Sequence, residues 1–453
     1  MANCTPMFPV TKTHPMAAPN EPIHGGSSTS GLDLVHGWVG SPNIRGTADI
    51  VKSCVVTLGL CSWSVLCLNV PDPTDTVRRC GFLRVKLWWT MVALVFPEVV
   101  TGVAGEQWRA ATQCKEDFVA MGFADWSMRM AFFANMGGFM LKAPDFPEFP
   151  INGQQLAYLI QRKYVALPDS IDSAIRDKNK ADGFARMVTV VQMVWFMLQC
   201  LGRAFQSLGL STLELTVVAN IFGTICSFAF WAHKPLDVES HVVLTTTTPM
   251  ATILVEAGDV ACKPYSRTPL DFVKPARTRP NLTTTCWLGV QTMFNAERDP
   301  PGRPIRSIGN TETLPAGSYH KWDVCFFVLF PLLFFGLHGV AWWFTFPTPV
   351  EALLWKIATV SLLSINVLHY GLVYTYIYHP KEIGMAVAGR PTRDIWEFYE
   401  VAPRWLIYSS HWFGMLIYMF ARLYILVEGW SGLRSLQSRL YRSVDWSNYI
   451  PHY

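Results

Sequence analysis

The sequence contains little charge for its length. Asp, Glu, Lys and Arg make up 15% of the 453 residues, whereas 51% are hydrophobic and the mean hydropathy is +0.23. Soluble domains carry about 25% charged residues, so the deficit indicates that lipid rather than water surrounds much of the chain. The net charge is only +4 and no basic block is present. We therefore expect no nucleic-acid partner.

Patterns that bind metals or cofactors are also missing. The 11 cysteines form no CxxC pair, and no Cys/His cluster has the spacing of a zinc site. Most of them lie in apolar runs, where cysteine packs as a small hydrophobic residue. A disulfide between Cys262 and Cys286 is an alternative for these two loop cysteines. Walker, GxGxxG, GxSxG and metal–diphosphate motifs do not occur. We expect no metal and no cofactor, which leaves proton chemistry, transport or scaffolding.

What the sequence does contain is long apolar runs. A helix needs about 20 apolar residues to cross about 30 Å of hydrocarbon. Runs of that length predict an all-α, polytopic transmembrane helix bundle with about seven spans. A shorter apolar segment, 126–141, is interpreted as a re-entrant or interfacial helix, and in the alternative as an eighth span. The seven predicted spans cover residues 50–70, 83–105, 185–206, 213–232, 324–346, 352–378 and 404–428.

Polar segments divide the chain into parts. Residues 1–45 form a tail rich in Pro, Thr and Ser that is expected to be disordered. A first transmembrane half, 46–235, is separated from a second half with a C-terminal tail, 323–453, by a large polar loop, 236–322. Because this loop is long for a structureless connection, we interpret it as a small appended unit or as partly disordered. Residues 167–184 alternate in charge and predict an exposed helix at the membrane surface.

Basic residues set the predicted topology, because short cytosolic loops are enriched in Lys and Arg. Arg78, Arg79 and Lys86 place the first loop in the cytosol, and Arg439 favours a cytosolic C-terminus; seven spans satisfy both. The polar loop then lies in the lumen, where Asn281 in an Asn-Leu-Thr sequon is a glycosylation site. We expect a multi-pass protein of the endoplasmic reticulum or another endomembrane.

Charges inside the predicted spans are the first candidates for function, since each costs about 3 kcal/mol on insertion scales. Glu98 follows Pro97, whose helix kink opens backbone groups toward a cavity. It is either a proton-donating carboxylic acid or half of an ion pair between helices. Glu214 sits in a helix-start pattern with Ser211 or Thr212 as N-cap, which favours a structural role. Glu428 in the last span is a further candidate proton donor.

The last predicted span also carries a polar stripe. His411 and Arg422 are eleven residues apart and fall on one helix face, whereas Arg422 and Glu428 are about 240° apart and do not pair. The stripe either lines a cavity or satisfies Asn366 or His369 of the neighbouring span. His338, alone in an apolar run, is interpreted as a packed, hydrogen-bonded histidine.

Several phrases resemble a large, mostly uncharacterised family of fungal polytopic integral-membrane proteins. The resemblance runs from about residue 36 to the end and omits most of the polar loop. More weakly, the chain is similar in build to membrane-bound meroterpenoid (terpene) cyclases of fungal secondary-metabolite clusters. The phrases are HGWVGSPNIRGTADI, CSWSVLCLNVP, FANMGGFML, KNKADG, MVWFMLQCLGR, LELT, HKPLDV, ARLYILVEGW, LRSL and DWSNYIPHY.

Three functions remain open. A proton-initiated terpene cyclase would take a lipophilic prenylated substrate from the bilayer and protonate it with Glu98, Glu428 or Glu214. Aromatic faces would stabilise the carbocation by cation–π contacts, although an interfacial aromatic belt is the better explanation for most of these residues. A transporter or lipid-binding protein would hold an anionic group with His411 and Arg422, and a non-catalytic scaffold is the third alternative. Neighbouring biosynthetic enzymes are expected partners of a cyclase. The aromatic candidates are Trp88, Trp89, Trp195, Trp342 and Trp343.

Overall fold

The computed structural model is mostly helical. All described residues lie in one compact unit, Leu34–Tyr453. The structure describes residues 34–41, 44–72, 80–167, 171, 175, 183–273, 302–311, 321–393, 397–398 and 401–446.

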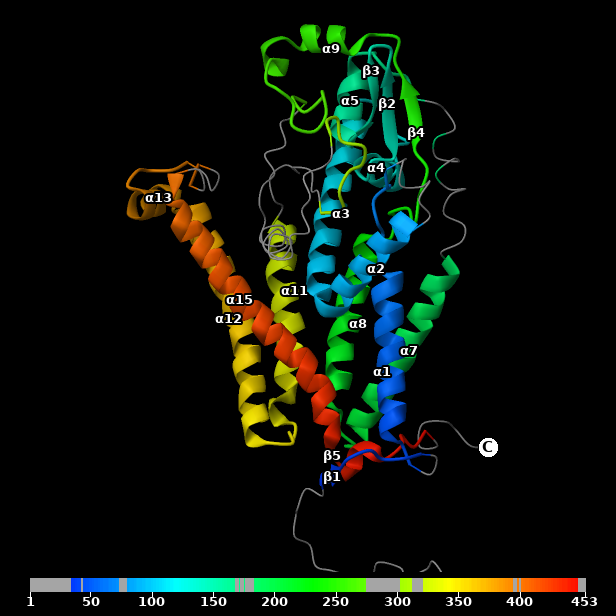
Figure 1. Ribbon diagram of the computed structural model, residues 1–453, viewed down its shortest axis with the longest axis vertical. Helices are drawn as coiled ribbons and strands as arrows, with labels where there is room; N and C mark the ends of the chain where they lie inside the picture. Colours follow the sequence, from blue (N-terminus) through cyan, green and yellow to red (C-terminus); the bar gives the residue numbers. More distant parts are fainter. Residues whose placement is uncertain are drawn as a thin grey trace, which may run out of the picture. The chain divides into compact units, whose positions relative to one another are not determined.

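Each of the seven predicted apolar runs is helical over most of its length, because these runs are long, rich in helix-forming residues and bounded by Pro, Gly or polar caps. The predicted span 50–70 is too long at its end: its helix stops at Ser64, and residues 65–70 are not helical. Helix α8 lies at the centre and packs against α1, α3, α11 and α15, while α12 packs against α11 and α15 (Figure 1). The helices are α1 (Thr47–Ser64), α2 (Cys80–Val95), α3 (Pro97–Ala120), α7 (Gly183–Phe205), α8 (Thr212–Phe230), α11 (Lys321–Gly339), α12 (Pro349–Tyr378) and α15 (Arg404–Ser431).

Within the described residues, four helical stretches are long and apolar enough to cross a membrane, or five if the bent pair α2–α3 counts as one span. They are Gly183–Phe205, Thr212–Phe230, Pro349–Leu368 and Trp412–Arg434. Val328–Trp343, in the predicted span 324–346, is a shorter apolar helix. Length and apolar composition therefore support fewer spans than the seven predicted from the sequence.

The predicted span 83–105 is not one straight helix. Helix α2 ends at Val95 and α3 begins at Pro97, and the two are bent by 113° relative to each other. Proline has no N–H to continue the helix, and it fits well at the first position of a new one. The break is the element on which the first candidate site is built.

The segment 126–141 is a helix only in its first part. Helix α4 (Met128–Asn135) is followed by Gly137 at φ +80°, and strand β2 (Phe139–Ala143) begins two residues later. The interpretation of the whole segment as one re-entrant or interfacial helix is therefore wrong for residues 139–141. Gly137 has the left-handed backbone that turns the chain away from a helix.

Strand β2 is the middle of a three-stranded sheet in the order β3-β2-β4. Strand β3 (Phe146–Ile151) pairs with it antiparallel and β4 (Val242–Thr245) pairs with it parallel, so the start of the predicted polar loop belongs to this sheet. Helices α5 (Gly153–Gln161) and α9 (Met250–Ala257) lie with the sheet at one end of α3 (Figure 1). Buried aromatic residues such as Phe133, Phe139 and Phe149 form its core.

The other end of the bundle is closed by a short antiparallel pair of strands. Strand β1 (Leu34–His36) pairs with β5 (Ser435–Gln437), which directly follows α15 and the turn η3 (Gly432–Arg434). The turn η2 (Val340–Trp343) follows α11. Several sequence predictions lie wholly or partly outside the described residues, namely the disordered tail, residues 167–184, Asn281 and the Cys262–Cys286 disulfide.

Candidate functional site

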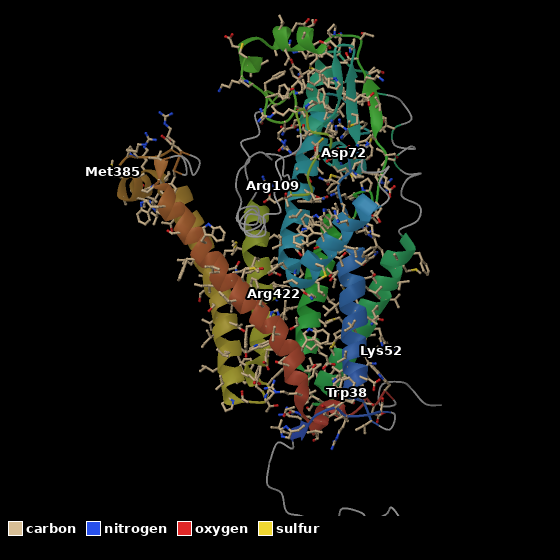
Figure 2. All side chains as sticks on the ribbon, viewed as in Figure 1. Trp38, Lys52, Asp72, Arg109, Met385 and Arg422 are labelled. Atoms are coloured by element: carbon tan, nitrogen blue, oxygen red, sulfur yellow. The ribbon has the colours of Figure 1, made fainter. Side chains whose placement is uncertain are left out.

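The first candidate site is the break between α2 and α3. Glu98, in the first turn of α3, accepts a hydrogen bond from the hydroxyl group of Tyr418 on α15. Its carboxylate Oε1 also lies 3.7 Å from the guanidinium Nε of Arg422, whose side chain is 0% exposed. Figure 2 labels Arg422 within the helix bundle. We call Glu98, Tyr418 and Arg422 the break cluster. In this cluster Glu98 forms an ion pair between two helices, which is the second of the two interpretations offered by the sequence.

The charges of the break cluster match the ends of the two helices. The Nε–H group of Arg422 donates a hydrogen bond to the carbonyl oxygen of Val95, the last residue of α2, at 2.9 Å. Helix C-termini carry unsatisfied carbonyl groups and negative partial charge, whereas helix N-termini carry positive partial charge. Arg422 therefore stabilises the end of α2 and Glu98 the start of α3. This pairing satisfies polar backbone groups that the break exposes inside an apolar bundle.

Three charged atoms of the cluster have no hydrogen-bond partner among the described residues: Glu98 Oε2 and both Nη atoms of Arg422. The Arg422 guanidinium carbon lies 5.2 Å from the centre of the Phe334 ring. His338, one turn further along α11, is fully buried and its Nδ1 lies 3.1 Å from the Phe334 carbonyl oxygen. The sequence interpretation of His338 as a packed, hydrogen-bonded residue agrees with this contact.

The predicted polar stripe on α15 is only partly as expected. Arg422 contacts the α2–α3 break, whereas Asn366 donates a hydrogen bond to the Leu362 carbonyl oxygen of its own helix at 2.8 Å. The side chains of His411 and His369 lie outside those that the structure describes. The partner of Arg422 was not predictable, because a carbonyl group freed by a helix break has no sequence signature of its own.

Glu214 is a structural residue of the opposite end of the bundle. The Ser211 side chain accepts from the Glu214 N–H at 3.2 Å, and Glu214 Oε2 accepts from the Ser211 N–H at 2.9 Å. This is the capping box that the sequence predicted. Glu214 also forms a buried ion pair with Arg45, which ties the N-terminal segment to α8.

Glu428 lines the second candidate site, which we call the Glu428 cavity. It has a volume of about 250 Å³ and lies where the start of α8, the turn η2 and the end of α15 meet. Glu428 is buried, and its Oε2 accepts from the Ser431 hydroxyl at 2.9 Å, while its Oε1 has no partner among the described groups. The lining residues include Leu210, Ser211, Thr212, Val340, Trp343, Phe344, Phe346, Gln437 and Arg439.

The tryptophan candidates do not gather at one site. Trp89 is buried in the core near the α2–α3 break, whereas Trp88, Trp195 and Trp342 are exposed. Trp195 stacks on Trp446 with 6.0 Å between ring centres. Trp343 lines the Glu428 cavity and is 81% exposed, so it lies at the rim. Exposed tryptophans on apolar helices fit the interpretation as an interfacial aromatic belt. Trp343 is the candidate that lines the Glu428 cavity.

A buried lysine was not singled out from the sequence. Lys234, just beyond α8, donates to the Cys67 carbonyl oxygen at 2.6 Å, to Asn69 Oδ1 at 2.8 Å and to Gln107 Oε1 at 2.7 Å. Burial lowers the pKa of the Lys234 amine to about 7, because the ammonium ion loses its hydration. The three acceptors satisfy the three N–H donors of the ammonium group. In the sequence, the only indication of this role is that Lys234 lies directly after an apolar run and before Pro235.

The fold and these sites define a helical bundle with apolar candidate spans, buried charges at a helix break and a cavity at one end. Residues 23–262 and 325–453 match a family described as a family of unknown function (DUF8562). The chain belongs to that family. The unmatched residues 263–324 include much of the predicted polar loop. No curated protein and no solved structure matches the chain.

Proposed function

We propose that the chain is a multi-pass membrane protein of a fungal endomembrane and that it binds a lipophilic small molecule in the Glu428 cavity. The seven-span topology is part of this proposal: α1, the bent α2–α3 pair and α11 would join the four apolar stretches. All of these helices lie in one bundle, and α7, whose apolar span is mostly exposed, offers a surface that lipid would cover.

The observation that carries the binding proposal is a buried carboxylate oxygen beside an aromatic cavity. Glu428 Oε1 has no hydrogen-bond partner within the described part of the chain. An unsatisfied buried polar atom costs about 1–3 kcal/mol, and a hydroxyl or amine group of a ligand would remove that cost. Phe344, Phe346 and Trp343 supply apolar lining around it.

The size of the cavity fits the polar end of an amphiphile. Small-molecule pockets span about 300–1,000 Å³, and this one is just below that range at about 250 Å³. The exposed Trp343 and the partly exposed Val340 lie at the rim, so an apolar tail would leave the cavity past these residues. The proposed ligand class is therefore a hydroxylated or amine-bearing lipid, a prenylated phenol included.

A proton-initiated cyclase is the second candidate, and the aromatic lining favours it at the same cavity. Glu428 in its protonated form would donate a proton to an alkene or epoxide, and the rings of Trp343 and Phe344 would face the resulting cation. Glu98 is less suited to this role in the present arrangement. Its carboxylate is held by Arg422 and Tyr418, and the cavity lined by the adjacent Pro97 measures only about 10 Å³, which is too small for a prenylated substrate.

The test uses the purified protein in nanodiscs and a farnesylated phenol as the probe. Quenching of tryptophan fluorescence reports binding, because Trp343 lies at the rim. Glu428→Gln is expected to weaken binding about tenfold, a loss of about 1.4 kcal/mol. Val340→Trp is expected to weaken it further by filling the mouth. Glu116→Gln, an exposed carboxylate away from this cavity, is the matched control and should bind like the parent.

The same preparation distinguishes the two candidates. Incubation with the prenylated phenol and its epoxide, followed by product analysis, reports cyclisation. Binding without a cyclised product supports the lipid-binding proposal alone. A product that disappears in Glu428→Gln supports the cyclase at this cavity, whereas loss only in Glu98→Gln moves the acid to the break cluster. A parent protein that binds no probe, or a Glu428→Gln variant that binds it equally, contradicts the cavity assignment.

A further inference from the structure

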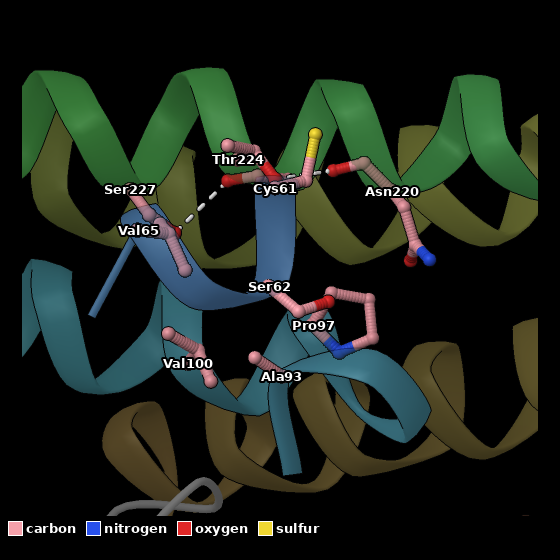
Figure 3. Close-up of a pocket in the computed structure, with 10 residues that line it drawn as sticks. Cys61, Ser62, Val65, Ala93, Pro97, Val100, Asn220, Thr224 and Ser227 are labelled. Atoms are coloured by element: carbon pink, nitrogen blue, oxygen red, sulfur yellow. Dashed lines mark hydrogen bonds between the residues drawn. The ribbon is translucent and has the colours of Figure 1, made fainter. Parts of the chain in front are cut away.

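The α2–α3 break contains a second, much smaller cavity. Its volume is about 10 Å³, and its lining comes from α1, α2, α3 and α8. A cavity needs roughly 10–15 Å³ to hold one water molecule. The lining is unusually polar for the centre of an apolar bundle, with Ser62, Asn220, Thr224 and Ser227 among its residues (Figure 3).

One polar atom at this cavity lacks a partner. Asn220 is 3% exposed, and its Oδ1 has no hydrogen-bond partner in the described residues. In Figure 3 its amide group extends from α8 toward the side of Pro97. The neighbouring hydroxyl groups are already engaged: Thr224 donates to the Asn220 carbonyl oxygen at 2.9 Å, and Ser227 and Thr101 lie 2.9 Å apart. These contacts leave Asn220 Oδ1 to be satisfied from the cavity.

The break supplies a second acceptor. Ala93 lines the cavity and stands four residues before Pro97, which has no N–H to donate to the Ala93 carbonyl group as a helix would require. A water molecule has two donors, which match Asn220 Oδ1 and the Ala93 carbonyl oxygen. The Ser62 hydroxyl is placed to donate to the water oxygen. A buried water with about three partners is the usual arrangement in proteins.

We infer that the cavity between Asn220, Ser62 and the Ala93–Pro97 turn is a binding site for one ordered water molecule that joins α1, α2 and α8. The site is independent of the Glu428 cavity. Its role is to hydrate the helix break at the Ala93 carbonyl group, whereas Arg422 satisfies the Val95 carbonyl group. Together, one side chain and one water molecule would satisfy the Val95 and Ala93 carbonyl groups, which the end of α2 and the missing N–H of Pro97 leave without helix partners.

A double-mutant cycle tests the site. Gly223 lines the cavity, and a Cβ added there meets only ordinary contacts, the nearest being Thr101 Oγ1 at 3.5 Å. Gly223→Ala therefore adds a methyl group beside Pro97 at the cavity without a clash, and we expect it to displace the water. Asn220→Leu, which has a similar size, removes the buried amide oxygen that the water would satisfy. Melting temperatures are measured in nanodiscs for the parent, both single variants and the double variant.

The water and a dry void give opposite results. With a bound water, Gly223→Ala is less favourable in the parent than in the Asn220→Leu background by about 2 °C or more, because only in the parent does loss of the water leave Asn220 Oδ1 without a partner. With a dry void, filling it raises the melting temperature equally in both backgrounds, which overturns the inference. The cycle cancels the helix propensity of alanine, since that gain is common to both backgrounds.

A density map of the parent protein gives an independent readout if Asn220→Leu does not fold. A peak within hydrogen-bond distance of Asn220 Oδ1 is expected, and a clear map without that peak contradicts the site. Gly371→Ala is the control for the thermal measurement. This helical glycine has open space at its Cβ position, so its effect should not depend on Asn220.

Discussion

At the scale of single residues, Arg422 connects the sequence signal to the structure most directly. A charge in an apolar run needs a partner, and Arg422 has two: the Glu98 carboxylate and the Val95 carbonyl group. The guanidinium group suits this position because it is always charged and its several donors are held in a fixed plane. The residue thus joins the last helix of the chain to the break between α2 and α3.

Arg422→Met is expected to destabilise the protein by about 3 kcal/mol, because it leaves Glu98 buried without an opposite charge. Thermal unfolding in nanodiscs measures this loss. The double variant Glu98→Gln with Arg422→Met should recover part of the loss, since no uncompensated charge remains. Arg434→Met is the control: Arg434 pairs with Glu351 near the surface and its loss should cost under 1 kcal/mol. Equal costs for the two arginines would contradict the assignment.

At the scale of elements, buried hydrogen bonds hold the connections between helices. Lys234 at the end of α8 binds the linker after α1 through Cys67 and Asn69, and binds α3 through Gln107. Gln107 and Asn69 in turn contact Asn310, which lies in the described segment 302–311. Lys234 therefore joins the end of α8 to the linker after α1 and to α3. Both of these contact the segment 302–311.

The pKa of Lys234 makes this junction sensitive to pH. Because the folded pKa is about 7 and the ordinary value is 10.5, the unfolded chain retains a proton between these values that the folded protein has released. The free energy of unfolding therefore rises with pH across this window, with a slope of up to ~1.4 kcal/mol per pH unit.

The difference in melting temperature between pH 7 and pH 9 measures this effect. It should be more positive for the parent than for Lys234→Met, which has no group to titrate there. Lys263→Met removes an exposed lysine and should keep the pH dependence of the parent. If Lys234→Met keeps it too, another group is responsible.

At the scale of the whole molecule, the open question is the number of spans. Seven spans place the polar loop in the lumen, whereas eight place it in the cytosol. Asn3-Cys-Thr is a second sequon, in the N-terminal tail that both topologies place in the lumen, so the test uses an Asn3→Gln background. In microsomes, the seven-span proposal predicts that this variant is glycosylated and that its mobility increases after deglycosylation, and adding Asn281→Gln is expected to abolish that shift. An unglycosylated Asn3→Gln variant, with a control sequon at the C-terminus that is modified, would favour eight spans.

How much was predictable depends on the range of the interactions involved. The helices at residues 185–206, 213–232, 352–378 and 404–428 followed from long apolar runs, and the Ser211–Glu214 capping box followed from local spacing. The break at Pro97 was indicated, although its bend of 113° was not. Strand β2 was missed because its partners β3 and β4 lie on either side of it in the sheet and β4 is about 100 residues away in sequence.

The sequence by itself determined where most of the apolar helices lie, because apolar runs, proline and caps act within a few residues. It also determined that Glu98, Glu428 and Arg422 needed partners, since burial makes isolated charges costly. Only the tertiary structure decided which partners these are: Tyr418 and a freed carbonyl group at the break, and an aromatic cavity at Glu428. The physical reason is that contacts between helices depend on packing angles and breaks, which no local pattern of residues encodes.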